Sequence, residues 1–467
     1  MFIMRHFFYV LAILILASGT QNIHAQRIQS QADPFNNGDR VCFIGNSITH
    51  GGSYHSLVYL FYLTRFPERR IDVFNCGIRG DNVKGTLNRF NEDIAVHKST
   101  VATIKLGTND INRSLYVNST PEKEAEKLKA DARYKSNMKE LVRKLDSMQT
   151  KIIFLTPAYY EQKPMSDSTI ALGLNKGFEK YGLFLDSLSR KYKCGIVDFH
   201  YMMDSISMTR QKIDPDFTLI SLDRIHPEYS GHFVMAFSFL KALQISPFVS
   251  NTVIDTKRKK VLEAINCTVS EMEISRNEIS FQHLEKSLPF PVSAYPADTT
   301  LIPFTHWFNR EILQVKGLSL DKKYMLTIDS IRIAEFTGKQ LQSGINLALI
   351  PSTPQAAQAS EIAVLNEKRR QIELTYRDIK FVEFEVLTPE ELKLSKDQLN
   401  ELLAKRLKSY EAGRTRAVMN ILKDIFTNYM KNVGKQNDCL IEIDQLVNDI
   451  YKLNKPVLHH YNLTRIN

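Results

Sequence analysis

The stretch RVCFIGNSITHGG, residues 40–52, begins as an apolar run and stops abruptly at Gly45, Asn46 and Ser47. A glycine and a serine directly after a buried strand indicate a tight strand-to-helix turn that presents a hydroxyl at the carboxyl edge of a sheet. Proteins of the α/β class bind their ligands at this edge. The stretch therefore predicts an α/β sheet with Ser47 as a candidate functional residue; the alternative is that Ser47 only caps the next helix.

Residues 39–243 alternate short apolar runs with longer amphipathic segments. The predicted strands are RVCFIG (40–45), IDVFNCG (71–77), VATIKLG (101–107), KIIFLTP (151–157) and GIVDFH (195–200). The predicted helices cover residues 53–66, 83–94, 121–148, 175–192 and 228–243. Because the strands are almost wholly apolar and helices separate them, we expect an α/β fold with a doubly wound parallel sheet of five strands, covered on both faces.

The pattern of the chain changes after residue 250. Segments such as EILQVKGL and KYMLTIDSIRIAEF predict strands joined by turns, so residues 251–350 are expected to form a smaller β-rich accessory region. Residues 351–467 are expected to be helical, with Thr388, Pro389 and Glu391 as the capping-box start of a long helix through residue 426. The interleaved charges of NEKRRQIELTYRDIK, within this region, indicate a solvated helix face.

The first 25 residues predict a secretory signal peptide, because Arg5 precedes a short apolar run and Ala25 supplies a small residue for cleavage. The run is too short to span a bilayer comfortably, and an uncleaved membrane anchor is the alternative. No later stretch is apolar for long enough to cross a membrane, so we expect a secreted or periplasmic protein without stable membrane insertion. The cysteines are few and odd in number, which argues against a disulfide framework, and Cys42 and Cys76 are expected to be buried core residues.

The formal net charge of +10 raises the question of a nucleic acid partner. However, acidic residues are interleaved with the basic ones throughout, and the chain has no concentrated basic tract with interleaved aromatic residues. We therefore expect no nucleic acid partner.

Two further blocks follow predicted strands. NCGIRGDN, residues 75–82, contains Gly80, whose backbone N–H is able to approach a substrate oxygen closely if the glycine does more than form a turn. IKLGTNDIN, residues 104–112, contains Asn109, whose amide either donates to an oxyanion or ties the loop together. Both blocks lie at the sheet edge expected for Ser47.

A last block, SLDRIHPEYSGH, leads into the final predicted helix of this part. Asp223 precedes His226 by three residues. This spacing lets the carboxylate accept the Nδ1–H of the histidine and leaves Nε2 free to take a proton. A histidine with such a partner is a candidate general base, and we expect it to converge with Ser47 at the same edge.

Together the four blocks resemble the SGNH subgroup of the GDSL-type esterases and lipases, over residues 39–243. The resemblance implies a flavodoxin-like sheet, with Ser47 as nucleophile and His226 as a base oriented by Asp223. Gly80 and Asn109, with the backbone N–H of Ser47, would form the oxyanion hole. At position 46 the chain has asparagine where the commonest family pattern has aspartate, and we expect this short polar side chain to brace the turn.

The resemblance implies a hydrolase domain over residues 26–250, followed by an extension like those of some secreted members, and no metal or cofactor. We expect a serine esterase that removes a small acyl group, acetyl foremost, from an acylated oligo- or polysaccharide; the sugar and the oligomeric state stay open. Four bordering residues are candidates for binding the sugar or are solvated loop residues: Arg79, Asp81, His50 and Arg224. The alternatives are a lipid esterase or thioesterase, a carbohydrate-binding protein without turnover, and an interaction protein acting through its helical segment.

Overall fold

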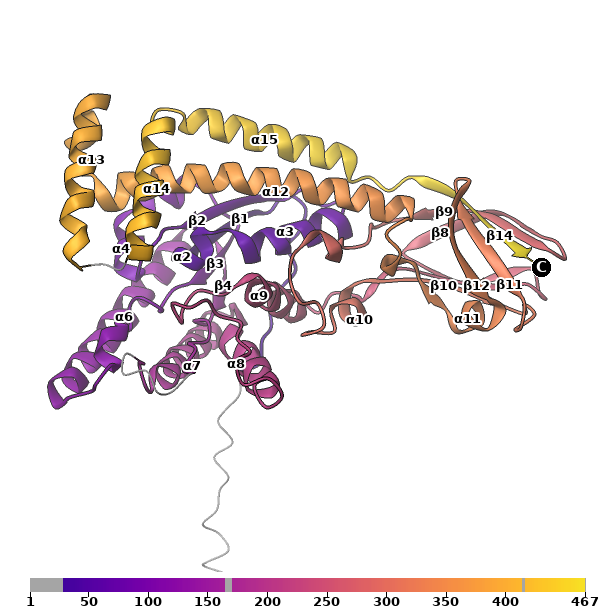
Figure 1. The fold of residues 1–467 in the computed structure, drawn as a ribbon, viewed down its shortest axis with the longest axis horizontal. Helices are drawn as coiled ribbons and strands as arrows, with labels where there is room; N and C mark the ends of the chain where they lie inside the picture. Colours follow the sequence, from indigo (N-terminus) through magenta and orange to yellow (C-terminus); the bar gives the residue numbers. More distant parts are fainter. Residues whose placement is uncertain (1–27, 164–169, 414–415, 467) are drawn as a thin grey trace, which may run out of the picture.

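The computed structural model describes residues 28–163, 170–413 and 416–466, and the predicted signal peptide lies outside them. Figure 1 shows an α/β part, a β-rich part at the right of the view, and a long helix, α12 (Pro354–Phe381), that runs along the α/β part toward the β-rich part. Within the described ranges, no helix combines the length and the apolar character needed to cross a membrane.

The α/β part has a five-stranded sheet in the order β2-β1-β3-β4-β5. Every neighbouring pair is parallel, which confirms the predicted doubly wound arrangement. The strands are β1 (Arg40–Gly45), β2 (Asp72–Gly77), β3 (Val101–Lys105), β4 (Lys151–Leu155) and β5 (Gly195–Val197). Since β2 and β3 flank β1, the loops that follow these three strands lie side by side at one edge of the sheet.

Helices cover both faces of this sheet. They are α2 (Ser47–His50), α3 (Ser53–Arg65), α4 (Val83–Asn88), α5 (Phe90–Asp93), α6 (Pro121–Ser147), α7 (Leu174–Tyr192), α8 (Phe199–Arg210) and α9 (Tyr229–Ala242). The sequence did not predict α8, because the apolar run of β5 continues into it: β5 ends at Val197, and Asp198 caps α8 by accepting a hydrogen bond from the backbone N–H of Tyr201.

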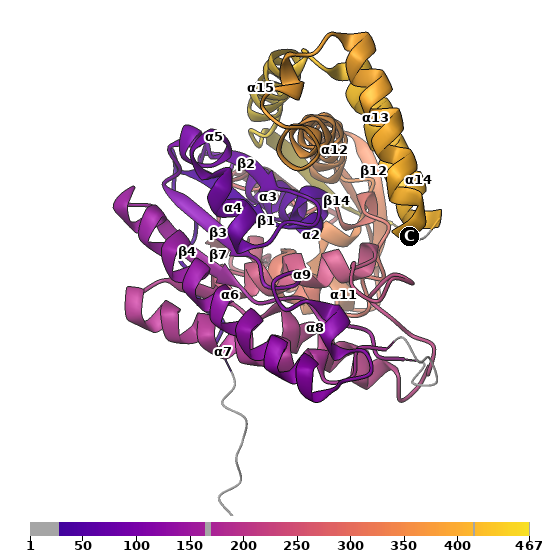
Figure 2. The ribbon, with the colours of Figure 1, turned by 90° about the vertical axis from the view of Figure 1, so that its left-hand side faces the viewer.

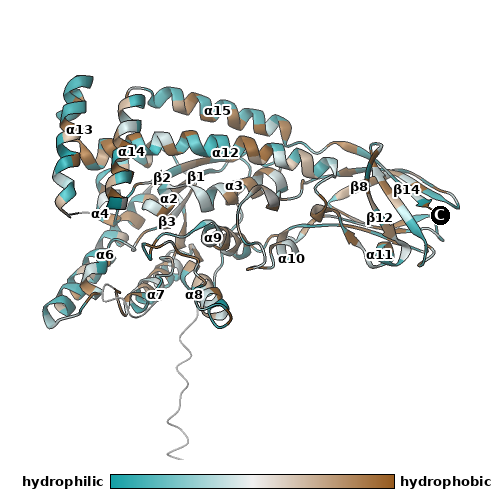
Figure 3. Ribbon diagram, viewed as in Figure 1, coloured by the Kyte–Doolittle hydropathy of each residue, from teal (hydrophilic) through white to brown (hydrophobic). Residues whose placement is uncertain are grey.

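Each face of the sheet buries its own core, because successive strand residues point to opposite sides. Val41 and Phe43 of β1 pack with residues of α3 and α9, whereas Cys42 and Ile44 pack with residues of α6 and α7. Figure 3 shows α9 mostly in the hydrophobic colour and α6 mostly in the hydrophilic one, in line with nearly complete burial of α9. Cys42 and Cys76 are fully buried and form no disulfide, as predicted.

The β-rich part contains two sheets, with strand orders β13-β10-β6-β7 and β12-β11-β14-β9-β8. The strands are β6 (Phe248–Asp255), β7 (Lys260–Ile265), β8 (Cys267–Ile274), β9 (Glu278–Glu285), β10 (Arg310–Lys316), β11 (Lys323–Ile328), β12 (Ile331–Thr337), β13 (Ile345–Asn346) and β14 (Leu458–Ile466). Of two short helices in this stretch of sequence, α11 (Gly338–Ser343) packs in the β-rich part, whereas α10 (Phe304–Phe308) buries Phe304 and Phe308 in the core with α3 and α9.

The carboxy-terminal region is helical as predicted, but its last segment forms a strand that the sequence did not predict. β14 pairs with β9 and β11 and so returns the end of the chain to the β-rich part. His459, Tyr461 and Leu463 are buried, while the residues between them are more exposed. This period of two is typical of a strand with one buried face.

The remaining helices are α12, α13 (Lys396–Tyr410), α14 (Arg416–Asn432) and α15 (Gln436–Leu453). Figure 2 shows α12 end-on, between the α/β sheet layer and the other three helices. Thr388 and Glu391 do exchange the predicted capping bonds, but they open only a 3-10 turn, and α13 has its own capping box from Ser395 to Gln398. The predicted long helix is divided, since a 3-10 turn at Glu411–Gly413 separates α13 from α14.

Candidate active site

Ser47 is the first residue of α2, directly after the turn that ends β1. The N-cap is Asn46, whose side chain accepts a hydrogen bond from the N–H of Ile48 at 3.2 Å. Asn46 therefore braces the turn as expected, and the hydroxyl of Ser47 is not used as a cap. Gly45 is required here because a Cβ at this position would lie 2.1 Å from Oγ1 of Thr49.

The structure brings Ser47, His226 and Asp223 together in one chain of contacts. Oγ of Ser47 lies 2.6 Å from Nε2 of His226. Nδ1 of His226 contacts Oδ2 of Asp223 through a short hydrogen bond. Oδ1 of Asp223 accepts hydrogen bonds from the backbone N–H groups of Ile225 and His226, each at 2.9 Å. These bonds fix the carboxylate relative to the imidazole.

The surroundings of Asp223 favour the ionised form of its carboxyl group. Partial burial acts to raise the pKa of Asp223, but the hydrogen bonds and the positive charge available from His226 hold it well below its usual range. An ionised carboxylate at Nδ1 selects the tautomer that carries its proton there. Nε2 is then the acceptor that faces the Ser47 hydroxyl. About half of each side chain is exposed, so the pair is open to a substrate.

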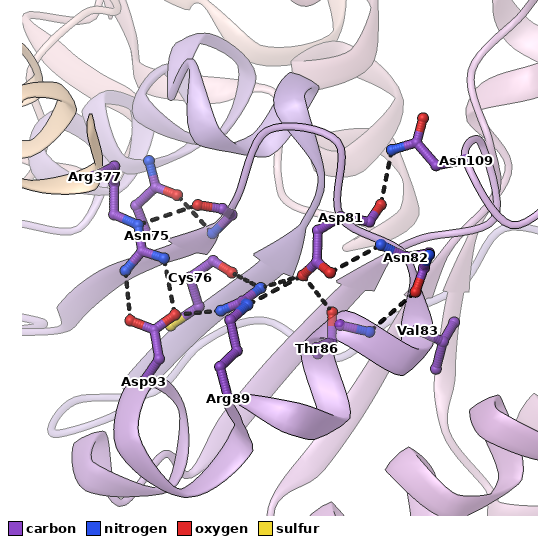
Figure 4. A network of polar contacts seen from close by, with 12 residues as sticks. Asn75, Cys76, Asp81, Asn82, Val83, Thr86, Arg89, Asp93, Asn109 and Arg377 are labelled. Carbon is purple, nitrogen blue, oxygen red and sulfur yellow. Dashed lines mark hydrogen bonds and ion pairs between the residues drawn. The ribbon is translucent and has the colours of Figure 1, made fainter. Parts of the chain in front are cut away.

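Gly80 and Asn109 lie on the loops that follow β2 and β3. Gly80 has φ of +76°, and a Cβ there would meet nothing within 4 Å, so the space beside it is open. Nδ2 of Asn109 donates to the backbone oxygen of Asp81 at 2.7 Å, which ties the two loops together (Figure 4). Among the described residues, neither the backbone N–H of Ser47 nor that of Gly80 has a hydrogen-bond partner. Both are available to an incoming oxyanion.

Two of the bordering candidates do not face this space. The carboxylate of Asp81 is fully buried and accepts from Thr86 at 2.8 Å and from Arg89 at 2.7 Å, as Figure 4 shows. His50 is also fully buried, and its Nε2 lies 2.9 Å from Oδ1 of Asp378 on α12. We therefore correct the expectation that these two side chains contact a sugar: each is part of the internal bracing.

The other two candidates are partly exposed but already have protein contacts. The side chain of Arg79 is 31% exposed and its Nε lies 3.6 Å from Oδ1 of Asp378. Arg224 has φ of +70° and donates through Nη1 to the backbone oxygen of Lys163 at 2.6 Å. Arg79 thus remains near the site, while Arg224 fastens the His226 loop to a neighbouring segment.

The sequence did not predict the part that α12 has in this site. Nη1 of Arg370 donates to the backbone oxygen of Gly51 at 2.8 Å, and Nε of Arg377 donates to that of Gly77 at 3.1 Å. One side of the segment interpreted as a solvated helix face is in fact buried, since Arg369 is 1% and Arg377 0% exposed. Their spacing along α12, with Asn366 and Glu373 on the same side, is the signal that could have indicated a buried polar face.

A cavity of about 270 Å³ is lined by residues of α3, which follows Ser47 in the sequence, of α9, which follows His226, and of α12. Its walls include Ser53 of α3, Tyr229 of α9, Tyr295 of the β-rich part, and Glu367 and Arg370 of α12. Within residues 28–163, 170–413 and 416–466, no cluster of three or more His, Cys, Asp or Glu side chains is arranged as metal ligands.

Known proteins resemble this chain over the residues that form the site. The model of the GDSL-like lipase/acylhydrolase family matches residues 43–233. A solved structure of a gut microbial diltiazem-metabolizing enzyme is 30% identical, with a TM-score of 0.83, and the match covers 94% of this chain and 100% of that one. An acetylxylan esterase of Geobacillus stearothermophilus is 26% identical over 224 residues, which are 44% of this chain and 94% of the relative. The first likeness extends over the β-rich and helical parts, whereas the second is confined to less than half of the chain.

Proposed function

The chain belongs to the GDSL-like lipase/acylhydrolase family, and on this basis we propose that it is a serine esterase that removes small acyl groups, acetyl foremost, from carbohydrates. The observation that carries the proposal is the contact chain from Ser47 through His226 to Asp223. A hydroxyl with an imidazole nitrogen 2.6 Å away is arranged for attack on an ester carbonyl.

In the proposed reaction, Oγ of Ser47 attacks the carbonyl carbon while Nε2 of His226 accepts its proton. The tetrahedral oxyanion is held by the backbone N–H groups of Ser47 and Gly80 and by the amide of Asn109. When the intermediate collapses, His226 gives the proton to the leaving alkoxide and the acyl group stays on Ser47. Water, deprotonated by His226, then attacks the acyl carbonyl. The bond to Oγ of Ser47 breaks, His226 returns the proton to Oγ, and the acid is released. The ionised Asp223 stabilises the imidazolium in both steps.

The preference for a small acyl group on a sugar has a more limited basis. The loops that follow β1, β2 and β3 and the segment that carries His226 are rich in Gly, Asn and Asp, which suit hydrogen bonds to sugar hydroxyls better than an apolar channel for a long acyl chain. The Geobacillus relative is named for acetylxylan, an acetylated carbohydrate. Export, proposed from the predicted signal peptide, would bring the enzyme to glycans outside the cytoplasm.

A panel of esters tests this proposal. We expect kcat/KM to fall from acetyl to butyryl to decanoyl esters of one alcohol, and acetate to be released from acetylated xylooligosaccharides. Diltiazem belongs in the panel because the gut microbial relative is described as a diltiazem-metabolizing enzyme. A rise of kcat/KM with chain length, together with no acetate from any glycan, would contradict the proposal and favour the lipid esterase.

Replacement of Asn109 by alanine is expected to lower kcat by roughly 100-fold, because one donor to the oxyanion is lost. KM should change little, since the ground-state carbonyl makes weaker use of the same donor. Steady-state kinetics on an acetyl ester measure both constants. The matched control is Asn88→Ala on the exposed end of α4, which should leave both unchanged. Wild-type kcat in Asn109→Ala would remove this residue from the proposed oxyanion hole.

A further inference from the structure

Helix α12 contacts the loops that carry the proposed nucleophile and oxyanion hole, although the contacting residues are 300 to 328 positions apart along the chain. Arg370 donates to the backbone of Gly51, just after α2, and Arg377 donates to the backbone of Gly77, at the end of β2. These two loops also pack directly on each other, since a Cβ at position 77 would lie 2.3 Å from the backbone nitrogen of His50. The two loops therefore touch each other, and each is also hydrogen-bonded to α12.

Asp378 is the residue of α12 that contacts both loops through one atom. Its Oδ1 lies 2.9 Å from Nε2 of His50, the last residue of α2, and 3.6 Å from Nε of Arg79, the residue before Gly80. Asp378 is 8% exposed on its side chain, and His50 is not exposed at all. The contact is therefore shielded from water, where a charge-assisted hydrogen bond is stronger than at the surface.

The protonation state of His50 fits this arrangement. Burial lowers the pKa of His50 to about 4, more than the hydrogen bond to Asp378 raises it. The imidazole is then neutral near pH 7, and its Nε2–H donates to the carboxylate. The bond thus fixes the orientation of the ring and, through it, the last turn of α2.

From this geometry we propose that Asp378 is a positioning residue, which sets the distance between Ser47 on α2 and the N–H of Gly80 by bridging His50 and Arg79. This inference rests on the proposed function. It gives the carboxy-terminal region an indirect part in catalysis, because an oxyanion hole works only when its donors are held where the charge develops. Asp378 itself touches no reacting atom.

A purely structural role is the alternative, and α12 offers a matched control for it. Glu373 is also buried on α12, 5% exposed, and it accepts from Nη1 of Arg369 at 3.0 Å. This contact with Arg369, both an ion pair and a hydrogen bond, lies within α12. Glu373→Gln removes a buried charge from the same helix without removing a contact to the catalytic loops.

The experiment compares Asp378→Ala, Asp378→Asn and Glu373→Gln in the full chain, at a temperature at which all three are folded by circular dichroism. In Asp378→Ala we expect kcat and kcat/KM on an acetyl ester to fall equally, by about 10- to 100-fold, with KM nearly unchanged. Asp378→Asn keeps an oxygen that accepts from His50 and should recover part of the loss. Glu373→Gln should keep the wild-type kcat even where its melting temperature drops.

Hydrogen exchange provides a readout that does not depend on turnover. Amide exchange in peptides spanning residues 47–52 and 77–82 should become faster in Asp378→Ala and stay unchanged in Glu373→Gln. Equal kcat values for Asp378→Ala and Glu373→Gln would overturn the positioning role while leaving the esterase proposal intact. If the wild type hydrolyses no ester, the proposed function fails, and the exchange comparison then decides the inference: unchanged exchange at residues 77–82 would overturn it.

Discussion

Replacement of Ser47 by alanine is expected to lower kcat on an acetyl ester by about 10⁶-fold, the scale of loss when the nucleophile of a serine triad is removed. The expectation follows from the position of Oγ, 2.6 Å from Nε2 of His226. The fold should be unaffected, because Asn46 and not Ser47 caps α2. Steady-state kinetics give the loss, and the thermal unfolding midpoint should match that of the wild type.

Covalent labelling of the active-site serine serves as the control for this variant. A phosphonate ester that reacts with activated serines should modify the wild type once and Ser47→Ala not at all. Retention of the wild-type rate or of the label in Ser47→Ala would remove Ser47 from the mechanism.

Asp223→Asn is expected to lower kcat by about 10⁴-fold, because an amide favours the wrong tautomer of His226 and does not stabilise the imidazolium. The pKa of Asp223 lies well below its usual range, so this carboxylate stays ionised through the pH range of an ordinary assay. We therefore expect the wild type to lose no activity through protonation of Asp223 in that range, so the effect of the substitution should be nearly independent of pH there. The measurement is the pH dependence of kcat for the two proteins.

The exposed Asp216, on the segment that leads toward the same block, supplies the matched control. Asp216→Asn removes the same charge without touching His226, and its kcat should equal that of the wild type. If Asp223→Asn and Asp216→Asn have similar rates, the carboxylate does not act on the histidine.

The sequence predicted the part of the site that depends on local pattern. The end of an apolar run at Gly45 located the turn before Ser47, and the spacing of Asp223 and His226 anticipated their hydrogen bond. The parallel order of the sheet then explains why residues on separate loops meet at one edge. These features need only the period of the strands and the chemistry of near neighbours.

Other features depend on contacts between distant segments and could not be predicted in the same way. His50 and Asp81 lie beside the sequence blocks that form the site. Their inward orientation depends on partners that the local sequence does not reveal: α12 for His50 and the buried Arg89 for Asp81. The charges of α12 resemble those of a solvated helix until a partner surface is known, and Arg377 in fact pairs with the buried Asp93. The return of β14 into a sheet with β9 is a long-range pairing of the same kind.

The most direct test of the account is to trap the acyl-enzyme. Wild-type protein mixed with an activated acetyl ester is quenched in acid within the first turnover, digested, and analysed by peptide mass spectrometry. The account predicts one added acetyl group on the peptide that contains Ser47, assigned to Ser47 by fragmentation and absent from Ser47→Ala. An acetyl group on a different residue, or turnover of the ester with no acetylated peptide at any quench time, would contradict it.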